Sequence, residues 1–133
     1  MFARTGQSSY RSDVIASLSA VVNSGTYNGR ALALARELAA YVIAADVIDL
    51  KNFDVALDTS FRAKIRSLLT TSTSGGPGSL IECHEDRPNN WGMHCGASRA
   101  AVAAYLGDTT ALARVAQVFK GWLGDRSSYS GFS

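Results

Sequence analysis

The segment from Arg30 to Asp49 limits the fold more than any other part of this 133-residue chain. It is rich in alanine and leucine, and apolar side chains fall on nearly every face of the helix that it would form. Such a helix is normally surrounded by other helices, because each apolar face has to be covered. Its charged residues argue against a membrane span. They are Arg36, Glu37, Asp46 and Asp49. The segment therefore predicts a buried helix in an all-α fold.

The rest of the chain divides into further amphipathic segments, and only two prolines interrupt it. Apolar spacing and capping residues predict the helix starts. One helix is expected to start near Tyr10, with Ser8 or Ser9 as its cap, and another near Asn90. Two more are expected to be capped by Asp58 or Thr59 and by Asp108 or Thr109. The helix from Asn90 should end at Leu106, because Gly107 occupies a helix-ending position. We therefore predict about five helices in antiparallel pairs, in a single domain over residues 1–133. A flexible loop is expected at about 71–79, and a Gly/Ser-rich tail at 124–133.

Charge and motif content restrict the function. Lys and Arg number 13 against 11 Asp and Glu, and no basic run supplies a phosphate-binding stripe, which argues against a nucleic-acid partner. No phosphate loop or dinucleotide glycine pattern is present, so no cofactor is predicted. The N-terminus lacks the apolar core of a signal peptide. As written, the chain is expected to be cytoplasmic, or secreted if it is cut from a longer precursor.

The stretch EDRPNNWGMHCGASRAAVAAYLGD, residues 85–108, concentrates polar chemistry ahead of an alanine-rich helix. Counted at about 100° per residue, Asn90, His94 and Tyr105 share one helix face, whereas Arg99 lies on the opposite side. Arg87 precedes the helix and is placed to fold over its N-terminal end. Helix starts present free N–H groups and a partial positive charge, so this stretch is a candidate site for an anion.

The alternative is that the same stretch only caps the helix. Asn89 and Asn90 are both favoured N-cap residues, and Pro88 pre-sets the approach of the chain. Tyr129 offers a separate hint of ligand binding, because a tyrosine in a Gly/Ser-rich tail is hard to bury.

Both cysteines lie beside the two histidines, in the order Cys83, His84, His94 and Cys95. Zinc sites normally space paired ligands by two to four residues, so the adjacent pairs here match poorly and no metal is predicted. A Cys83–Cys95 disulfide would close a short loop, but nothing in the sequence indicates an oxidising compartment. Two reduced, partly buried thiols are expected.

Three segments resemble the helical, alginate-lyase-like domains of α/α-toroid polysaccharide lyases. They are ARELAAYVIAADVIDL, HEDRPNNWGMHCGASRAAVAAYLGD and FKGWLGDRSSYSGF. The resemblance runs from about Arg11 to Phe132, and its most specific part is Asn-Asn-Trp-Gly. It implies antiparallel helix pairs that form part of a toroid around a cleft for uronate chains.

The resemblance also implies binding or β-eliminative cleavage of an acidic, uronate polysaccharide. In such lyases, polar donors neutralise the uronate carboxylate, and a tyrosine or histidine moves the proton of the neighbouring carbon. The implied catalytic residues are Asn90, His94, Tyr105 and Tyr129. The implied substrate-binding residues are Arg87, Asn89, Trp91 and His84.

The chain departs from this family in two respects. Trp91 stands where the family has a histidine, and His94 replaces that histidine only by assumption. The chain is also shorter than a complete toroid, so we expect a fragment of a larger parent chain, a truncated relative, or a protomer of a homo-oligomer. The alternative function is a non-catalytic helical interaction domain whose apolar surface drives oligomerisation. Trp91 and the missing signal peptide favour that alternative.

Overall fold

The computed structural model describes residues 2–133, and this part of the chain forms eight α-helices. They are α1 (Phe2–Thr5), α2 (Ser8–Asn23), α3 (Ala31–Val47), α4 (Leu50–Phe53), α5 (Val55–Thr70), α6 (Leu80–Asp86), α7 (Asn90–Leu106) and α8 (Thr109–Trp122). The only β pairing within these residues is one isolated bridge between Arg30 and Ser74. The all-α prediction is confirmed, whereas the expected number of about five helices is too low.

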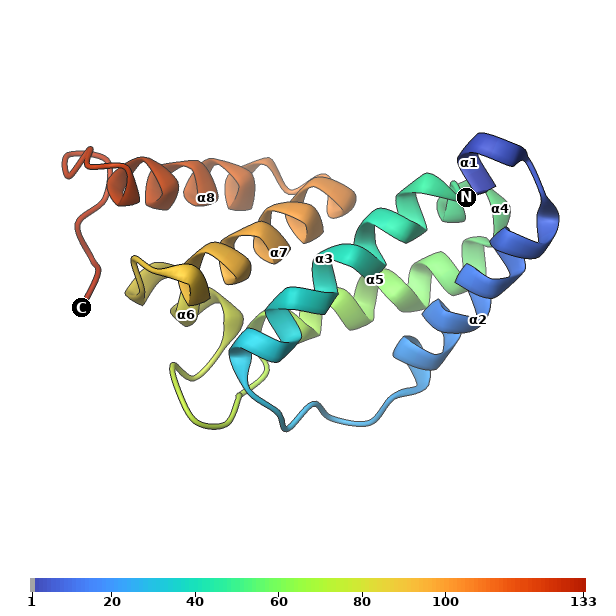
Figure 1. The fold of residues 1–133 in the computed structure, drawn as a ribbon, viewed down its shortest axis with the longest axis horizontal. Helices are drawn as coiled ribbons and strands as arrows, with labels where there is room; N and C mark the ends of the chain where they lie inside the picture. The colour runs from blue at the N-terminus through green and yellow to red at the C-terminus, as the bar shows by residue number, and fades with distance from the viewer. Residues whose placement is uncertain (1) are drawn as a thin grey trace.

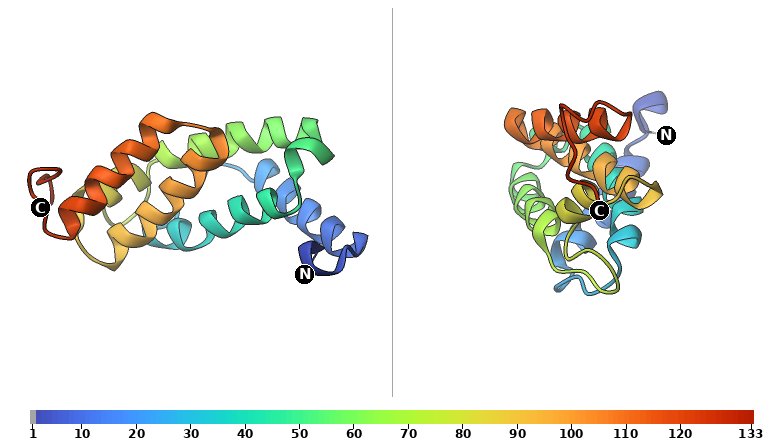
Figure 2. Two further views of the ribbon diagram at one scale, coloured as in Figure 1. Left: turned by 90° about the horizontal axis from the view of Figure 1, so that it is seen from above. Right: turned by 90° about the vertical axis from the view of Figure 1, so that its left-hand side faces the viewer.

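The helices build an elongated molecule with the two ends of the chain at opposite ends (Figures 1 and 2). Successive long helices run in opposite directions: α3 returns against α2, α5 against α3, and α8 against α7 (Figure 1). The most extensive contact is between α3 and α7, which run in the same direction. None of the described helices is both long and apolar enough to cross a membrane.

The crossing of α3 and α7 is fixed by a buried serine. The hydroxyl of Ser98 donates to the carbonyl of Ala35 at 2.7 Å and accepts from the N–H of Ala39 at 3.1 Å. These bonds satisfy a fully buried hydroxyl and set the register of the two helices. Further along α3 the helix stays open, because Ile43 is 57% and Val47 47% exposed. The prediction that this helix is surrounded therefore holds for only part of its circumference.

The sequence prediction was most accurate for α7 and α8. Asn89 caps α7, Gly107 ends it in the left-handed conformation at φ 72°, and Asp108 caps α8 by accepting from the N–H of Ala111. A capping residue was misplaced at α5, where Asp54 and not Asp58 or Thr59 accepts from the first turn. Gln7 precedes α2, which has no side-chain cap from Ser8 or Ser9.

Helix α6 was not predicted, and it is central to the candidate site. Its seven residues are too few for a clear 3.6-residue apolar period. The hydroxyl of Ser79 accepts from the N–H of Glu82 at 3.3 Å. A serine followed three residues later by a glutamate is a capping signature that the sequence does contain.

The segments predicted to be irregular connect and cover these helices. Residues 71–79 link α5 to α6, and the bridge between Arg30 and Ser74 ties this loop to the start of α3. The tail at 124–133 folds back, so that the N–H of Ser133 donates to the carbonyl of Asp86 at 3.0 Å. Both segments therefore lie close to α6.

Candidate functional site

The exposed and half-buried groups at the start of α7 form what we call the α7 N-terminal surface: Arg87, Asn89, Asn90, Trp91 and His94. The side chain of Asn89 accepts from the N–H of Trp91 at 2.9 Å, so Asn89 is the helix cap. Asn90 and His94 are exposed and one turn apart. The structure thus brings these predicted residues together, with Asn89 in a structural role.

Arg87 is held over this surface by the ring of Trp91. Its guanidinium carbon lies 5.4 Å from the ring centroid, a cation–π distance. The nearest carboxylate is that of Asp86, with 3.9 Å between its Oδ2 and the Nε of Arg87. This Nε is buried and makes no hydrogen bond within the described residues. Arg87 therefore has a fixed orientation over the ring, and its side chain is 39% exposed.

Trp91 is itself fixed by the loop at 71–79. A Cβ added to Gly76 would lie 3.1 Å from Cζ3 of Trp91, so the loop backbone rests on the indole. In this structure the tryptophan links the loop to Arg87. That role needs a large flat ring, which a histidine at the same position would not supply.

His84, a predicted substrate-binding residue, lies in the interior. It is 6% exposed, and a Cβ added to Gly96 would lie 2.7 Å from its Nε2. Its Nδ1 is 3.4 Å from Nη1 of Arg99. Burial, reinforced by the positive charge of Arg99, lowers the pKa of His84 to about 4. His84 is therefore a neutral packing residue with no open path to a polymer.

Glu85 joins three helices through Arg99 and Arg114, neither of which is a predicted site residue. Its carboxylate accepts from Arg114 of α8 at 3.0 and 2.7 Å and from Arg99 of α7 at 2.7 Å. These bonds, Arg114 first, lower the pKa of Glu85 to about 2. Arg99 is 7% exposed. The sequence does carry a signal for this contact, because Arg99 is a charged residue on an otherwise alanine-rich helix. A charged residue that is buried is almost always paired with an opposite charge.

Tyr129, a predicted proton-transfer residue, covers the same junction. Its hydroxyl donates to the carbonyl oxygen of Glu85 at 2.7 Å, and the guanidinium carbon of Arg114 lies 4.8 Å from its ring centroid. Burial and the negative charge of Glu85 raise the pKa of Tyr129. Tyr129 therefore closes the tail onto α6 and α8.

Tyr105 lies far from the α7 N-terminal surface, although it shares a helix with it. About 22 Å of helix axis separates it from Asn90. Its hydroxyl donates to the buried carboxylate of Asp58 at 2.5 Å, and Arg62 bonds the same carboxylate at 2.6 Å. Burial and this hydrogen bond raise the pKa of Tyr105. The structure does not bring Tyr105 within reach of a group bound at Asn90.

No group of three or more His, Cys, Asp or Glu side chains in residues 2–133 is arranged to hold a metal ion. His84 and Arg87 line a small cavity with Gly92 and Phe132, of about 10 Å³. That volume holds a water molecule at most. Cys83 and Cys95 are free thiols and fully buried, more so than the partial burial that we expected.

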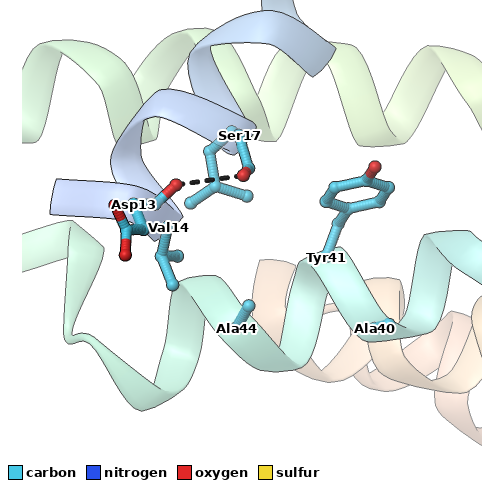
Figure 3. A pocket seen from close by; sticks show the side chains of 7 residues that line it. Asp13, Val14, Ser17, Ala40, Tyr41 and Ala44 are labelled. Carbon is cyan, nitrogen blue, oxygen red and sulfur yellow. Dashed lines mark hydrogen bonds between the residues drawn. The ribbon is translucent and has the colours of Figure 1, made fainter. Parts of the chain in front are cut away.

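The larger hollows lie elsewhere, in a groove between α2 and α3. Figure 3 shows Asp13, Val14 and Ser17 of α2 on one side and Tyr41 and Ala44 of α3 on the other. Three adjoining hollows of about 280, 520 and 710 Å³ follow this groove. Alanine side chains on α3 leave the groove shallow, and Ile43 and Val47 continue its wall to the surface.

No protein-family model, no curated protein and no solved structure was found to match this chain. The resemblance to alginate lyases therefore stays a prediction from the residues quoted above.

Proposed function

We propose that this chain binds an acidic, uronate-type polysaccharide through the α7 N-terminal surface. The observation that carries the proposal is the placement of Arg87, whose side chain is 39% exposed and is held over Trp91 beside the start of a helix. The first N–H groups of a helix lack partners within the helix and attract negative charge. A carboxylate at this point meets an arginine, the amide of Asn90 and the helix end together.

The exposed groups around Arg87 suit a polymer better than a small enclosed ligand. Asn90 and His94 are exposed on successive turns, and the adjoining cavity admits no sugar ring. On an open surface a polymer gains affinity because weak contacts along one chain add to each other. We therefore place the binding on the outer surface of the α6–α7 junction.

Cleavage by β-elimination needs a base within hydrogen-bond reach of the reacting carbon. Among the predicted proton-transfer residues, His94 is the one that shares the α7 N-terminal surface. Tyr105 and Tyr129 already donate to Asp58 and to the carbonyl of Glu85. The proposal is therefore binding, and any lyase activity would depend on His94.

The test is titration of the purified chain with polymannuronate, polyguluronate, polygalacturonate and a neutral glucan. We expect saturable binding of at least one acidic polymer, and none of the glucan. Arg87→Gln should weaken that binding about tenfold, the effect of losing one charge-assisted hydrogen bond. The matched control is Arg36→Gln, which removes the same charge from an exposed position on α3.

Two outcomes would contradict the proposal. One is absence of binding to every acidic polymer, and the other is an equal loss in Arg87→Gln and Arg36→Gln. Ultraviolet absorbance of unsaturated uronate ends, measured in the same samples, tests cleavage. A signal that is lost in His94→Ala and Asn90→Ala would extend the function from binding to β-elimination.

A second candidate function is self-association, and the groove between α2 and α3 favours it. Ile43 is 57% and Val47 47% exposed at the edge of this groove, and adjoining exposed apolar side chains are typical of protein–protein contact sites. We propose a second copy of the chain as the occupant. Light scattering should report a dimer that Ile43→Ser shifts toward monomer. A monomer at high concentration would contradict this second proposal and leave the first one standing.

A further inference from the structure

The contact between α6 and α7 is unusually close, because glycines line the α7 side. A Cβ added to Gly92 would overlap the carbonyl oxygen of Arg87 and lie 3.5 Å from that of Cys83. A Cβ added to Gly96 would lie 2.7 Å from the ring of His84. The two helix backbones therefore approach more closely than helices separated by larger side chains.

Cys83 and Cys95 lie in the middle of this contact. Gly92, Cys95 and Gly96 occupy positions i, i+3 and i+4, which share one face of α7. Cys83 is adjacent to His84, against which Gly96 packs. Both cysteines are 0% exposed. Each thiol is the first cause of the other's pKa shift, which is downward for Cys83 and upward for Cys95, so the two groups are close neighbours.

We propose that Cys83 and Cys95 form a disulfide that cross-links α6 to α7 under oxidising conditions. A disulfide needs Cα atoms roughly 4.4–6.8 Å apart, a separation that two helices reach only when small residues line their contact. Glycines on both sides of Cys95 supply that condition. The two buried thiols lie on neighbouring helices that already pack together, so the bond forms without moving either helix to a new partner.

The chemistry balances with glutathione disulfide as the oxidant. The Cys83 thiolate attacks one sulfur of glutathione disulfide, which forms a mixed disulfide and releases one glutathione thiolate. The Cys95 thiolate then attacks the sulfur of Cys83 and expels the second glutathione. The protein loses two hydrogen atoms, and two molecules of reduced glutathione carry them away.

The cross-link would enclose the α7 N-terminal surface in its loop. Arg87, Asn90, Trp91 and His94 all lie between Cys83 and Cys95 in the sequence. Closing a short loop stabilises a protein mainly by restricting its unfolded state. The inference does not depend on the proposed function, because it concerns the two thiols and not a ligand.

The test is refolding of the full chain from denaturant in a glutathione redox buffer, so that burial does not block the reaction. The products are then unfolded, alkylated and weighed. We expect a monomer that has lost two hydrogens and takes up no alkyl group. Its Tm should exceed that of the reduced chain by about 5–10 °C, and reductant should abolish the difference.

The single variants Cys83→Ala and Cys95→Ala are the controls, and neither should show a redox-dependent Tm. Three results would overturn the proposal. They are two alkylatable thiols after equilibration, glutathione adducts or intermolecular dimers in place of the internal bond, and an internal bond that lowers the Tm. The last result would mean that the folded contact does not accommodate the cross-link.

Discussion

The carboxylate of Glu85 on α6 accepts two hydrogen bonds from Arg114 on α8, from Nε at 3.0 Å and from Nη2 at 2.7 Å. The pair connects residues 29 positions apart, and Arg99 of α7 bonds the same carboxylate. Three helices therefore meet on one negative charge. This junction supports the backbone that leads into the α7 N-terminal surface, since Asp86 and Arg87 follow directly.

Glu85 should make the fold sensitive to acid in a defined window. Its pKa is lowered from 4.5 to about 2, so its ionised form stabilises the fold above about pH 4.5. That contribution is lost as the pH falls from about 4.5 to 2. Glu85→Gln should lower the free energy of unfolding at pH 7 by about 1–3 kcal/mol, discounted for its partial exposure. It should also flatten the acid dependence, measured by denaturant titration at several pH values.

Asp125→Asn is the control for this prediction. The pKa of Asp125 is also lowered to about 2, by Ser127 and Ser128, but Asp125 is exposed and ties only the tail. If Asp125→Asn flattened the acid dependence as much as Glu85→Gln, the junction of α6, α7 and α8 would not be the cause.

His84 should remain neutral well below the usual histidine range. Its pKa of about 4 lies below the ordinary 6.5 because the ring is buried and faces Arg99. As the pH falls, His84 is protonated in the unfolded chain before it is protonated in the folded chain. The contribution of neutral His84 to the free energy of unfolding is therefore present above about pH 6.5 and is lost as the pH falls from about 6.5 to 4. NMR titration of the ring protons, assigned with His84→Asn, measures this directly. A midpoint near 6.5 would contradict the buried placement.

Tyr105 should matter for stability and not for binding. Tyr105→Phe removes the hydrogen bond to Asp58 and leaves that buried carboxylate with Arg62. We expect a loss of about 1–3 kcal/mol in the free energy of unfolding and unchanged affinity for acidic polymer. Tyr41→Phe is the matched control on α3. A loss of polymer affinity in Tyr105→Phe, at unchanged stability, would contradict this prediction and mean that Tyr105 takes part in binding.

Gly92 should not tolerate a methyl group. In Gly92→Ala the new Cβ would overlap the carbonyl oxygen of Arg87, so α6 and α7 must move apart. We expect a loss of about 1–3 kcal/mol in thermal or denaturant unfolding. The control is Gly25→Ala, where nothing lies within 4 Å of the added Cβ. Equal stability of the two variants would mean that the helices are not in close contact.

The parts of the fold that the sequence predicted well are those encoded by neighbouring residues. The bounds of α7 follow from the cap at Asn89 and the left-handed Gly107, which act within one turn of the helix. Helix α6 was missed because seven residues give no clear period, although Ser79 and Glu82 carry its capping signature.

The parts of the site that the sequence could not predict depend on contacts between distant segments. Tyr105 and Asp58 are 47 positions apart, and Tyr129 and Glu85 are 44 positions apart. A helix-face count placed Tyr105 with Asn90, but the count gives direction around the axis and ignores distance along it. The proximity of Arg87, Asn90 and His94 could be predicted because those residues lie within about two helical turns of one another.

The most direct test of the proposed binding surface is amide and indole NMR of the labelled chain during titration with a uronate oligosaccharide. We expect the largest shifts to fall on Asn90, Gly92, His94 and the indole N–H of Trp91, and to saturate together. Shifts confined to the groove between α2 and α3, or no shifts at all, would contradict it.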